Sequence, residues 1–180
     1  MWSSDERYAA CAPGFFGHLL DLRLAGGEVW VCPGAEGTID AVEMWNPPGG
    51  LCAGPPDPAV AWAAASAAFT DAERRAWERF DELLAVPEEA GSYWYLGVLA
   101  TAPALQGTGL GRSLTTPMLA AADRSGLPTY LETASETNVA VYARLGFEVE
   151  REVQLPDVGP LARLMRREPA PPAPDVPFPM

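Results

Sequence analysis

The feature that most constrains the fold is an apolar segment followed by a turn and three evenly spaced glycines, between Tyr93 and Arg112. The pattern predicts a buried strand, a short turn that carries Pro103, and the start of a helix. The three glycines are Gly107, Gly109 and Gly111. Glycines at such a junction let the backbone approach a ligand closely, and the first amide groups of a helix have no partner within it. Together with the helix dipole, these donors favour an anion such as a phosphate.

Two common phosphate-binding motifs do not fit this turn. No Lys-Ser or Lys-Thr follows the last glycine, which argues against a nucleoside triphosphate loop. A dinucleotide fingerprint requires a Gly-x-Gly-x-x-Gly spacing, and this spacing is absent although Glu132 follows at about the right distance. A purely structural strand-to-helix turn remains the alternative.

The pattern Gln106-x-x-Gly109-x-Gly111 resembles the Q-x-x-G-x-G motif of the GNAT superfamily of acetyl-coenzyme A-dependent N-acetyltransferases. Downstream, Tyr-Leu-Glu-Thr at 130–133 and the segment from Asn138 to the Gly-Phe pair at 146–147 resemble that superfamily's later strand and helix. The resemblance covers residues 92–153, about one third of the chain. Within the superfamily, the pattern is most similar to small-molecule acetyltransferases of the puromycin-resistance type.

The order of predicted elements indicates an α/β fold, classed as α+β in some schemes, with one domain over residues 1–168. We expect a mixed, centrally parallel twisted sheet flanked by helices. The expected strands are 28–32, 38–45, a buried strand that begins near Tyr93 and ends before the turn at Pro103, 129–133, 147–155 and 161–167. The expected helices are 3–24, broken at Pro13, a hairpin insertion over 58–86, 109–124 with a bend at Pro117, and 139–145. The proline-rich tail 169–180 is expected to be disordered.

Members of the superfamily usually begin with another strand and helix, so the resemblance implies that this chain lacks them. The strand at 28–32 would then form an exposed sheet edge. A homodimer through this edge or through the helical hairpin is one expectation.

The resemblance also implies a set of residues that bind acetyl-coenzyme A through a strand backbone, a pyrophosphate turn and the following helix. They are Leu96, Val98, Leu99, Ala100, Gln106, Gly107, Thr108, Gly109, Leu110, Gly111, Arg112, Ser113, Asn138 and Tyr142. Gln106 is expected to brace the turn rather than perform chemistry. Tyr142 is the candidate general acid toward the leaving thiolate, because the superfamily places a tyrosine hydroxyl near the thioester sulfur.

The general base is an open choice between two carboxylates. Glu132 lies at the end of the parallel strand 129–133 and is the preferred base, acting through a water. Glu43 is the second choice. An ordinary solvated carboxylate is the alternative for both. His18 lies among apolar residues of the first helix, and nothing near it in sequence would orient it as a base.

Composition limits the partners. The 24 acidic residues outnumber the 12 basic ones, so nucleic acid is disfavoured and a cationic amine acceptor is compatible. No apolar stretch is long enough for a transmembrane helix, and the N-terminus lacks the features of a secretory signal, which favours a cytoplasmic protein. Three separated cysteines and a single histidine favour neither disulfides nor a metal site.

The predicted function is transfer of an acetyl group from acetyl-coenzyme A to a primary amine of a small molecule, by direct attack through a tetrahedral intermediate. Two alternatives remain at the level of sequence. One is a non-catalytic acyl-coenzyme A-binding or regulatory protein, and the other is an interaction module in which the glycine turn is only structural.

Overall fold

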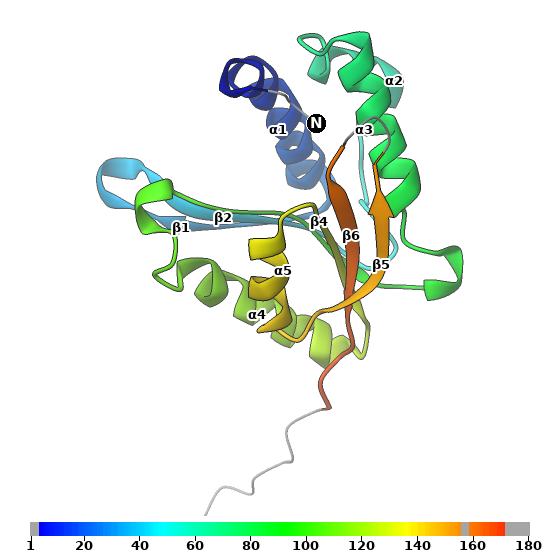
Figure 1. Ribbon diagram of the computed structural model, residues 1–180. Helices are drawn as coiled ribbons and strands as arrows, with labels where there is room; N and C mark the ends of the chain where they lie inside the picture. Colours follow the sequence, from blue (N-terminus) through cyan, green and yellow to red (C-terminus); the bar gives the residue numbers. More distant parts are fainter. Residues whose placement is uncertain (1–3, 156–158, 172–180) are drawn as a thin grey trace, which may run out of the picture.

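The computed structural model describes residues 4–155 and 159–171, and in this part of the chain six strands form one mixed sheet in the order β1-β2-β3-β4-β6-β5 (Figure 1). The strands are β1 (Glu28–Pro33), β2 (Ile39–Asn46), β3 (Trp94–Thr101), β4 (Thr129–Thr133), β5 (Glu148–Gln154) and β6 (Leu161–Arg167). The helices are α1 (Asp5–Gly26), α2 (Pro58–Ala65), α3 (Asp71–Leu84), α4 (Leu110–Ser125) and α5 (Glu136–Ala143). Only β3 and β4 pair in parallel, and the other neighbours are antiparallel. The predicted mixed sheet with a parallel centre is therefore confirmed.

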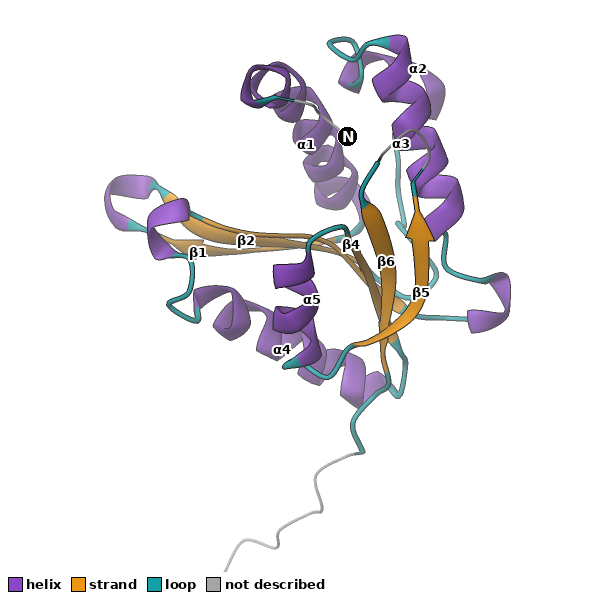
Figure 2. Cartoon of the chain, in the orientation of Figure 1, coloured by secondary structure: helices purple, strands orange, loops and turns teal. Residues whose placement is uncertain are grey.

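Helices cover both faces of the sheet (Figure 2). Helices α4 and α5 pack on one face around a core that includes Trp45, Leu96 and Leu131. Helix α3 packs on the other face of β4, β5 and β6 through Phe80 and Leu84.

A cluster of aromatic residues joins α1 to the α2–α3 hairpin. Phe15 of α1 stacks on Trp77 of α3, with ring centroids 4.3 Å apart, and Phe69 completes the buried cluster. Arg7 of α1 also forms an ion pair with Glu73 of α3. These contacts hold α1 against the hairpin above the sheet.

Helices α1 and α4 each contain a proline, and neither helix is interrupted by it. The predicted break of the first helix at Pro13 is wrong, because α1 continues from Asp5 through Gly26. A proline removes one backbone donor, and here the segments on both sides of it are anchored to the hairpin through Arg7 and Phe15. Helix α4 continues past Pro117, and the bend predicted at that residue stays a prediction.

The predicted caps of the helical hairpin are confirmed. The Asp57 carboxylate accepts from the amides of the first turn of α2, and Thr70 and Glu73 form a reciprocal capping box at the start of α3. Helix α2 ends at Ala65, because the chain turns at Ser66, whose hydroxyl donates to Trp62 O.

Strand β1 forms one edge of the sheet, as predicted, and exposes Trp30 and Val31. The absence of a strand and helix before α1 stays a prediction, and the same holds for the domain limit at residue 168. The predicted disordered tail falls largely on residues 172–180, outside the described part of the chain.

Candidate active site

The glycine turn before α4 has the backbone geometry that the sequence pattern predicts. Gly107 and Gly109 have φ values of +78° and +88°, a region that L side chains rarely adopt. The first helical hydrogen bond runs from Ser113 N to Gly109 O over 2.9 Å. The amides of Leu110, Gly111 and Arg112 precede that bond and point out of the helix end, where they can donate to an anion.

Side chains around this turn support its backbone. Gln106 Nε2 donates to Thr101 O over 3.3 Å, and Thr108 Oγ1 donates to Leu105 O over 2.7 Å. Gln106 thus braces the turn, as expected. Arg112 and Ser113 are exposed beside the helix start, and within the described residues no ion pair engages Arg112.

Strands β3 and β4 separate near the middle of the sheet. Their parallel pairing covers only Trp94↔Thr129, Tyr95↔Tyr130 and Leu96↔Leu131, although β3 continues to Thr101. The backbone of β3 from Val98 to Ala100 therefore has no partner in β4. The sheet opens into two parts at this point (Figure 1), which leaves space between the strands for an extended ligand that hydrogen-bonds to β3.

An extra residue in β3 lies at the start of this opening. Met44 pairs with Val98, but Trp45 pairs with Leu96, so Gly97 is a bulge in β3. Bulges bend a strand and redirect its side chains, and they are frequent beside active sites.

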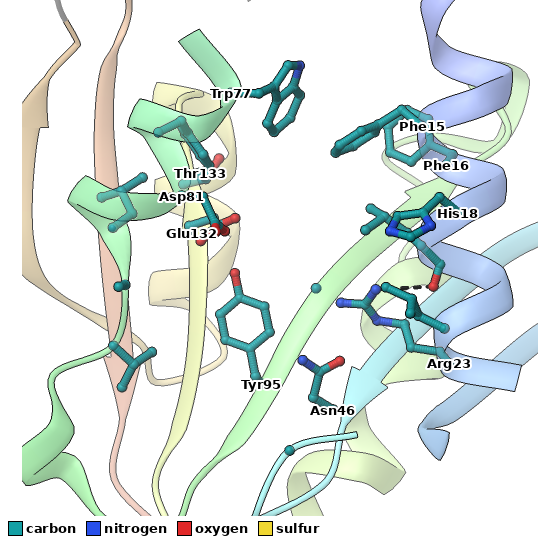
Figure 3. Close-up of a pocket in the computed structure, with 18 of the residues that line it drawn as sticks. Phe15, Phe16, His18, Arg23, Asn46, Trp77, Asp81, Tyr95, Glu132 and Thr133 are labelled. Atoms are coloured by element: carbon teal, nitrogen blue, oxygen red, sulfur yellow. Dashed lines mark hydrogen bonds between the residues drawn. The ribbon is translucent and has the colours of Figure 1, made fainter. Parts of the chain in front are cut away.

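A cavity of about 1430 Å³ lies on the sheet face that α1 and α3 cover (Figure 3). Its floor is formed by β3 and β4, its walls by α1 and the hairpin, and its aromatic lining includes Phe15, Phe16, Trp62 and Trp77. The cavity reaches the split between β3 and β4, since Gly97, Glu132 and Asn138 line it. The ring of His18 also lines it, 6.2 Å from the ring of Trp62.

Glu132 of β4 is the carboxylate at the floor of this cavity. Burial raises its pKa to about 7, and the negative charge of Asp81 adds to that rise. The hydroxyl of Tyr95, which points toward Glu132 (Figure 3), and the positive charge of Arg23 act in the opposite direction. A carboxylate with a pKa near neutrality is suited to accept a proton at physiological pH.

Tyr142 lies on the opposite face of the sheet. It is 8% exposed and packs in the core beneath α4 and α5, with its ring 5.9 Å from that of Phe147. Burial raises its pKa to about 12, so the hydroxyl keeps its proton at neutral pH. Glu132 and Tyr142 therefore approach the split sheet from opposite sides.

Asn138 does not share the environment of Tyr142, although the two are four residues apart on α5. Asn138 is exposed and lines the cavity, whereas Tyr142 is buried. Helix α5 begins at Glu136, and its cap is Ser135, so the predicted start at residue 139 is wrong. Ser135 Oγ accepts from the amide of Asn138, which leaves the Asn138 side chain available to a ligand.

The second candidate base, Glu43, does not line the cavity. It is fully buried on the α4 face near Thr115 and Trp45, and burial raises its pKa. A base on this face cannot reach an amine in the cavity.

Arg23, Asp81 and Tyr95 line the cavity and influence the pKa of Glu132, but the sequence did not predict them as site residues. Each has an ordinary local context, an arginine at the end of a helix, an acidic residue on a helix and a tyrosine in a strand. Only packing of α1 and α3 over β3 brings them together with Glu132.

Within residues 4–155 and 159–171, no group of three or more histidine, cysteine or acidic side chains is arranged to hold a metal ion. Cys11, Cys32 and Cys52 are free thiols. None of the described helices combines the length and apolar character needed to cross a membrane.

Comparison with known proteins gives one family. Residues 40–147, more than half of the chain, match the model of the Acetyltransferase (GNAT) family. The structure is similar to that of histone acetyltransferase HPA2 and related acetyltransferase from Corynebacterium glutamicum, with a TM-score of 0.63 and 25% sequence identity, over 96% of this chain and 81% of that chain.

Two more distant structures share the fold. Arylalkylamine N-acetyltransferase 2 from Aedes aegypti has a TM-score of 0.62 at 14% identity, over 91% of this chain and 87% of that chain. Naa20 from Chaetomium thermophilum, in complex with a bisubstrate analogue, has a TM-score of 0.52 at 19% identity, over 91% of this chain and 81% of that chain.

Proposed function

This chain belongs to the acetyltransferase (GNAT) family and is an acetyltransferase, and we propose that it transfers the acetyl group of acetyl-coenzyme A to a primary amine of a small molecule. The observation that carries the proposal is the position of Glu132 in a large cavity that meets the split between β3 and β4. Family membership sets aside the alternative of an interaction module with a merely structural glycine turn.

The residues around the split fit the donor. We propose that the amides at the start of α4 hold its pyrophosphate, and that Arg112 adds positive charge there. The backbone of Val98, Leu99 and Ala100 has no partner on the β4 side, and there it would hydrogen-bond to the pantetheine arm and to the thioester carbonyl, which supports the polarisation that attack requires. Acetyl-coenzyme A supplies the activated acetyl group as a thioester.

Glu132 would remove the proton from the acceptor ammonium, directly or through a water. With a pKa of about 7, a large fraction of this carboxylate is charged at neutral pH and yet basic enough to take a proton. The neutral amine then attacks the thioester carbonyl, and the amides of β3 stabilise the charge that develops on oxygen as the tetrahedral intermediate forms. The C–N bond forms as the intermediate is made, the nitrogen of the intermediate then loses a second proton, and the C–S bond breaks as the intermediate collapses to the amide and the thiolate.

Tyr142 would stabilise the departing thiolate from the α4 face. Its pKa of about 12 exceeds that of an ordinary thiol, about 8.5, so complete proton transfer from tyrosine to sulfur is unfavourable. We therefore propose that Tyr142 donates a hydrogen bond to the sulfur during bond cleavage, and that the proton which leaves the nitrogen of the tetrahedral intermediate reaches the thiolate afterwards.

The proposal is tested by a thiol-release assay with acetyl-coenzyme A and a panel of amines that includes arylalkylamines, amino acids, polyamines and aminoglycosides. Steady release that depends on both substrates, with the acetylated amine identified by mass spectrometry, is the expected result. The control is Glu132→Gln, which keeps the size of the side chain. Thermal stability with acetyl-coenzyme A is measured in parallel, since a ligand that binds the folded state raises it. Raised stability without acetylation of any amine would contradict the proposed reaction.

We also propose that two copies associate through the exposed edge of β1. Trp30 and Val31 of this edge are 46% and 45% exposed, and an apolar unpaired edge favours pairing with a second strand. Sedimentation of the wild type and of Trp30→Lys tests this, with the variant expected to be monomeric.

A further inference from the structure

Arg23 is a buried cation without a carboxylate partner. It lies in the last turn of α1 and is only 5% exposed. Its Nη1 donates to Leu19 O over 3.1 Å, and its Nε has no hydrogen-bond partner. Within the described residues, no acidic side chain lies within 4.0 Å of its guanidinium. A buried charge is costly unless it is paired, so this position favours binding of an anion.

The guanidinium of Arg23 faces the cavity and lies against the floor at Gly97 (Figure 3). A Cβ added at Gly97 would lie 3.0 Å from Arg23 Cζ and closer still to Nη2. Any side chain at this bulge would therefore displace the guanidinium. Gly97 thus makes room for a cation directly beside the split in the sheet.

The opposite charge occupies another part of the same cavity. Glu132 and Asp81 lie together, with the hydroxyl of Tyr95 directed toward them (Figure 3). The charge of Arg23 lowers the pKa of Glu132, so the two groups are near enough to act on one small molecule. No direct ion pair forms between them, and each keeps its charge available to a ligand.

An aromatic wall completes the cavity. Phe15, Phe16, Trp62 and Trp77 line the part formed by α1 and the hairpin. Such a surface favours an apolar or aromatic body, while a few polar groups fix its orientation. A bare amine would use the carboxylates and the aromatic wall but would leave Arg23 unpaired.

We infer that the acceptor is an amino acid with an aromatic or large apolar side chain, whose carboxylate binds Arg23 while its amino group faces Glu132. This inference rests on the proposed function, because it names the acceptor class for the same site. Arg23 is a specificity residue in this assignment. A planar guanidinium can bind a carboxylate through two parallel hydrogen bonds, which fixes the orientation of the amino group.

Three probes separate the two charges of such a ligand. L-Phenylalanine carries both, phenylethylamine lacks the carboxylate, and 3-phenylpropionate lacks the amine. Binding of each is measured by calorimetry in the presence of coenzyme A, and acetylation of the two amines by thiol release. The variants are Arg23→Met, which removes the charge, and Arg23→Lys, which keeps it. Arg79→Met is the matched control, because Arg79 lies on α3 in an exposed pair with Glu82.

The wild type is expected to bind 3-phenylpropionate and to use L-phenylalanine at least about tenfold more efficiently than phenylethylamine, the effect of one charge-assisted pair. Arg23→Met should lose at least about tenfold in binding of 3-phenylpropionate and should lose the preference for L-phenylalanine. The loss for phenylethylamine should be smaller, and it arises because removal of the Arg23 charge raises the pKa of Glu132. Arg23→Lys should retain part of both, and Arg79→Met should match the wild type.

Several results would overturn the inference. They are absence of 3-phenylpropionate binding by the wild type, unchanged binding by Arg23→Met, and an equal loss of activity with both amines in that variant. The last result would place Arg23 at the thioester rather than at the acceptor. If no amine is acetylated, the proposed function fails, but 3-phenylpropionate binding still decides whether Arg23 recognises a carboxylate. If Arg23→Met does not fold, the wild-type probes and Arg23→Lys decide it.

Discussion

Replacing Glu132 with glutamine should make the protein more stable at alkaline pH while removing the proposed catalytic base. The carboxylate has an ordinary pKa of 4.5, and the folded protein raises it to about 7, mainly through burial. Holding this group charged in the fold therefore costs about 3 kcal/mol, since each pKa unit corresponds to about 1.4 kcal/mol. Glutamine has a similar shape, carries no charge and can still accept a hydrogen bond from Tyr95.

The sign of the pH dependence follows from the raised pKa. Below pH 4.5 the carboxyl group is protonated in both states, and the substitution has little effect on the free energy of unfolding. Between pH 4.5 and about 7 the unfolded state loses the proton first, so the wild type becomes steadily less stable relative to Glu132→Gln. Above about pH 7 the difference should level off at up to about 3 kcal/mol in favour of the variant.

Urea unfolding of both proteins at several pH values from 4.5 to 8.5 measures this difference. Glu88→Gln is the control, because Glu88 is exposed in the turn before β3 and should show no such trend. Glu43 is also buried with a raised pKa, but it is present in both proteins and cancels in the comparison. If the free energies of unfolding of the two proteins differ by the same amount at pH 5 and at pH 8, the fold does not raise the pKa of Glu132 and this reasoning is refuted.

The same variant separates stability from function. In the wild type, kcat/KM should rise with pH around an apparent pKa near 7, because the charged carboxylate is the active form. Glu132→Gln should lose this rise and fall at least about 100-fold in kcat/KM, as is typical when a general base is removed. A variant that is more stable and equally active would exclude Glu132 as the base.

Three further predictions test the donor side and the fold. Tyr142→Phe should lower kcat at least about tenfold with little change in acetyl-coenzyme A affinity, and unchanged turnover would exclude its role at the thiolate. Gly109→Ala should destabilise the fold by about 1–2 kcal/mol, because Gly109 has a φ of +88°. It should also weaken acetyl-coenzyme A binding in a thermal-shift titration. The control is Gly54→Ala, because Gly54 lies in open space and has no such φ. Asp123→Asn should cost about 1–2 kcal/mol at pH 7 in urea unfolding, because Arg167 donates two hydrogen bonds of 2.6 and 2.9 Å to this carboxylate and lowers its pKa. That cost should shrink as pH falls below about 4, and a constant cost would argue against the ion pair.

The backbone geometry of the glycine turn, where we propose that acetyl-coenzyme A binds, was predictable because it depends on neighbouring residues alone. Gly107 and Gly109 need left-handed backbone angles, and the amides that they expose belong to the next few residues. The capping residues Asp57 and Thr70 were predictable for the same reason, since a cap acts within one helical turn. In each case a short stretch of sequence contains both the group and its partner.

The acceptor half was only partly predictable because it is assembled from distant segments. Glu132 was a candidate from its place at the end of β4, but its raised pKa depends on burial beneath α1 and α3. Arg23 had no local signal at all, and the space for its guanidinium depends on Gly97, more than 70 residues later in the chain. The choice between Glu132 and Glu43 likewise required knowing which sheet face each side chain occupies.

The unbroken α1 helix shows how these distant parts are connected. The break predicted at Pro13 would have detached the first part of α1 from the second, yet Arg7 and Phe15 anchor both parts to α3. The second part carries Arg23 over β3, and α3 carries Asp81 toward Glu132. Contacts between α1 and the hairpin therefore set the spacing between the positive and negative sides of the cavity. A substitution that loosens this contact, such as Phe15→Ala, should reduce discrimination between L-phenylalanine and phenylethylamine. It should reduce acetyl-coenzyme A binding less, because the amides proposed to hold the pyrophosphate lie at the start of α4, on the opposite side of the sheet.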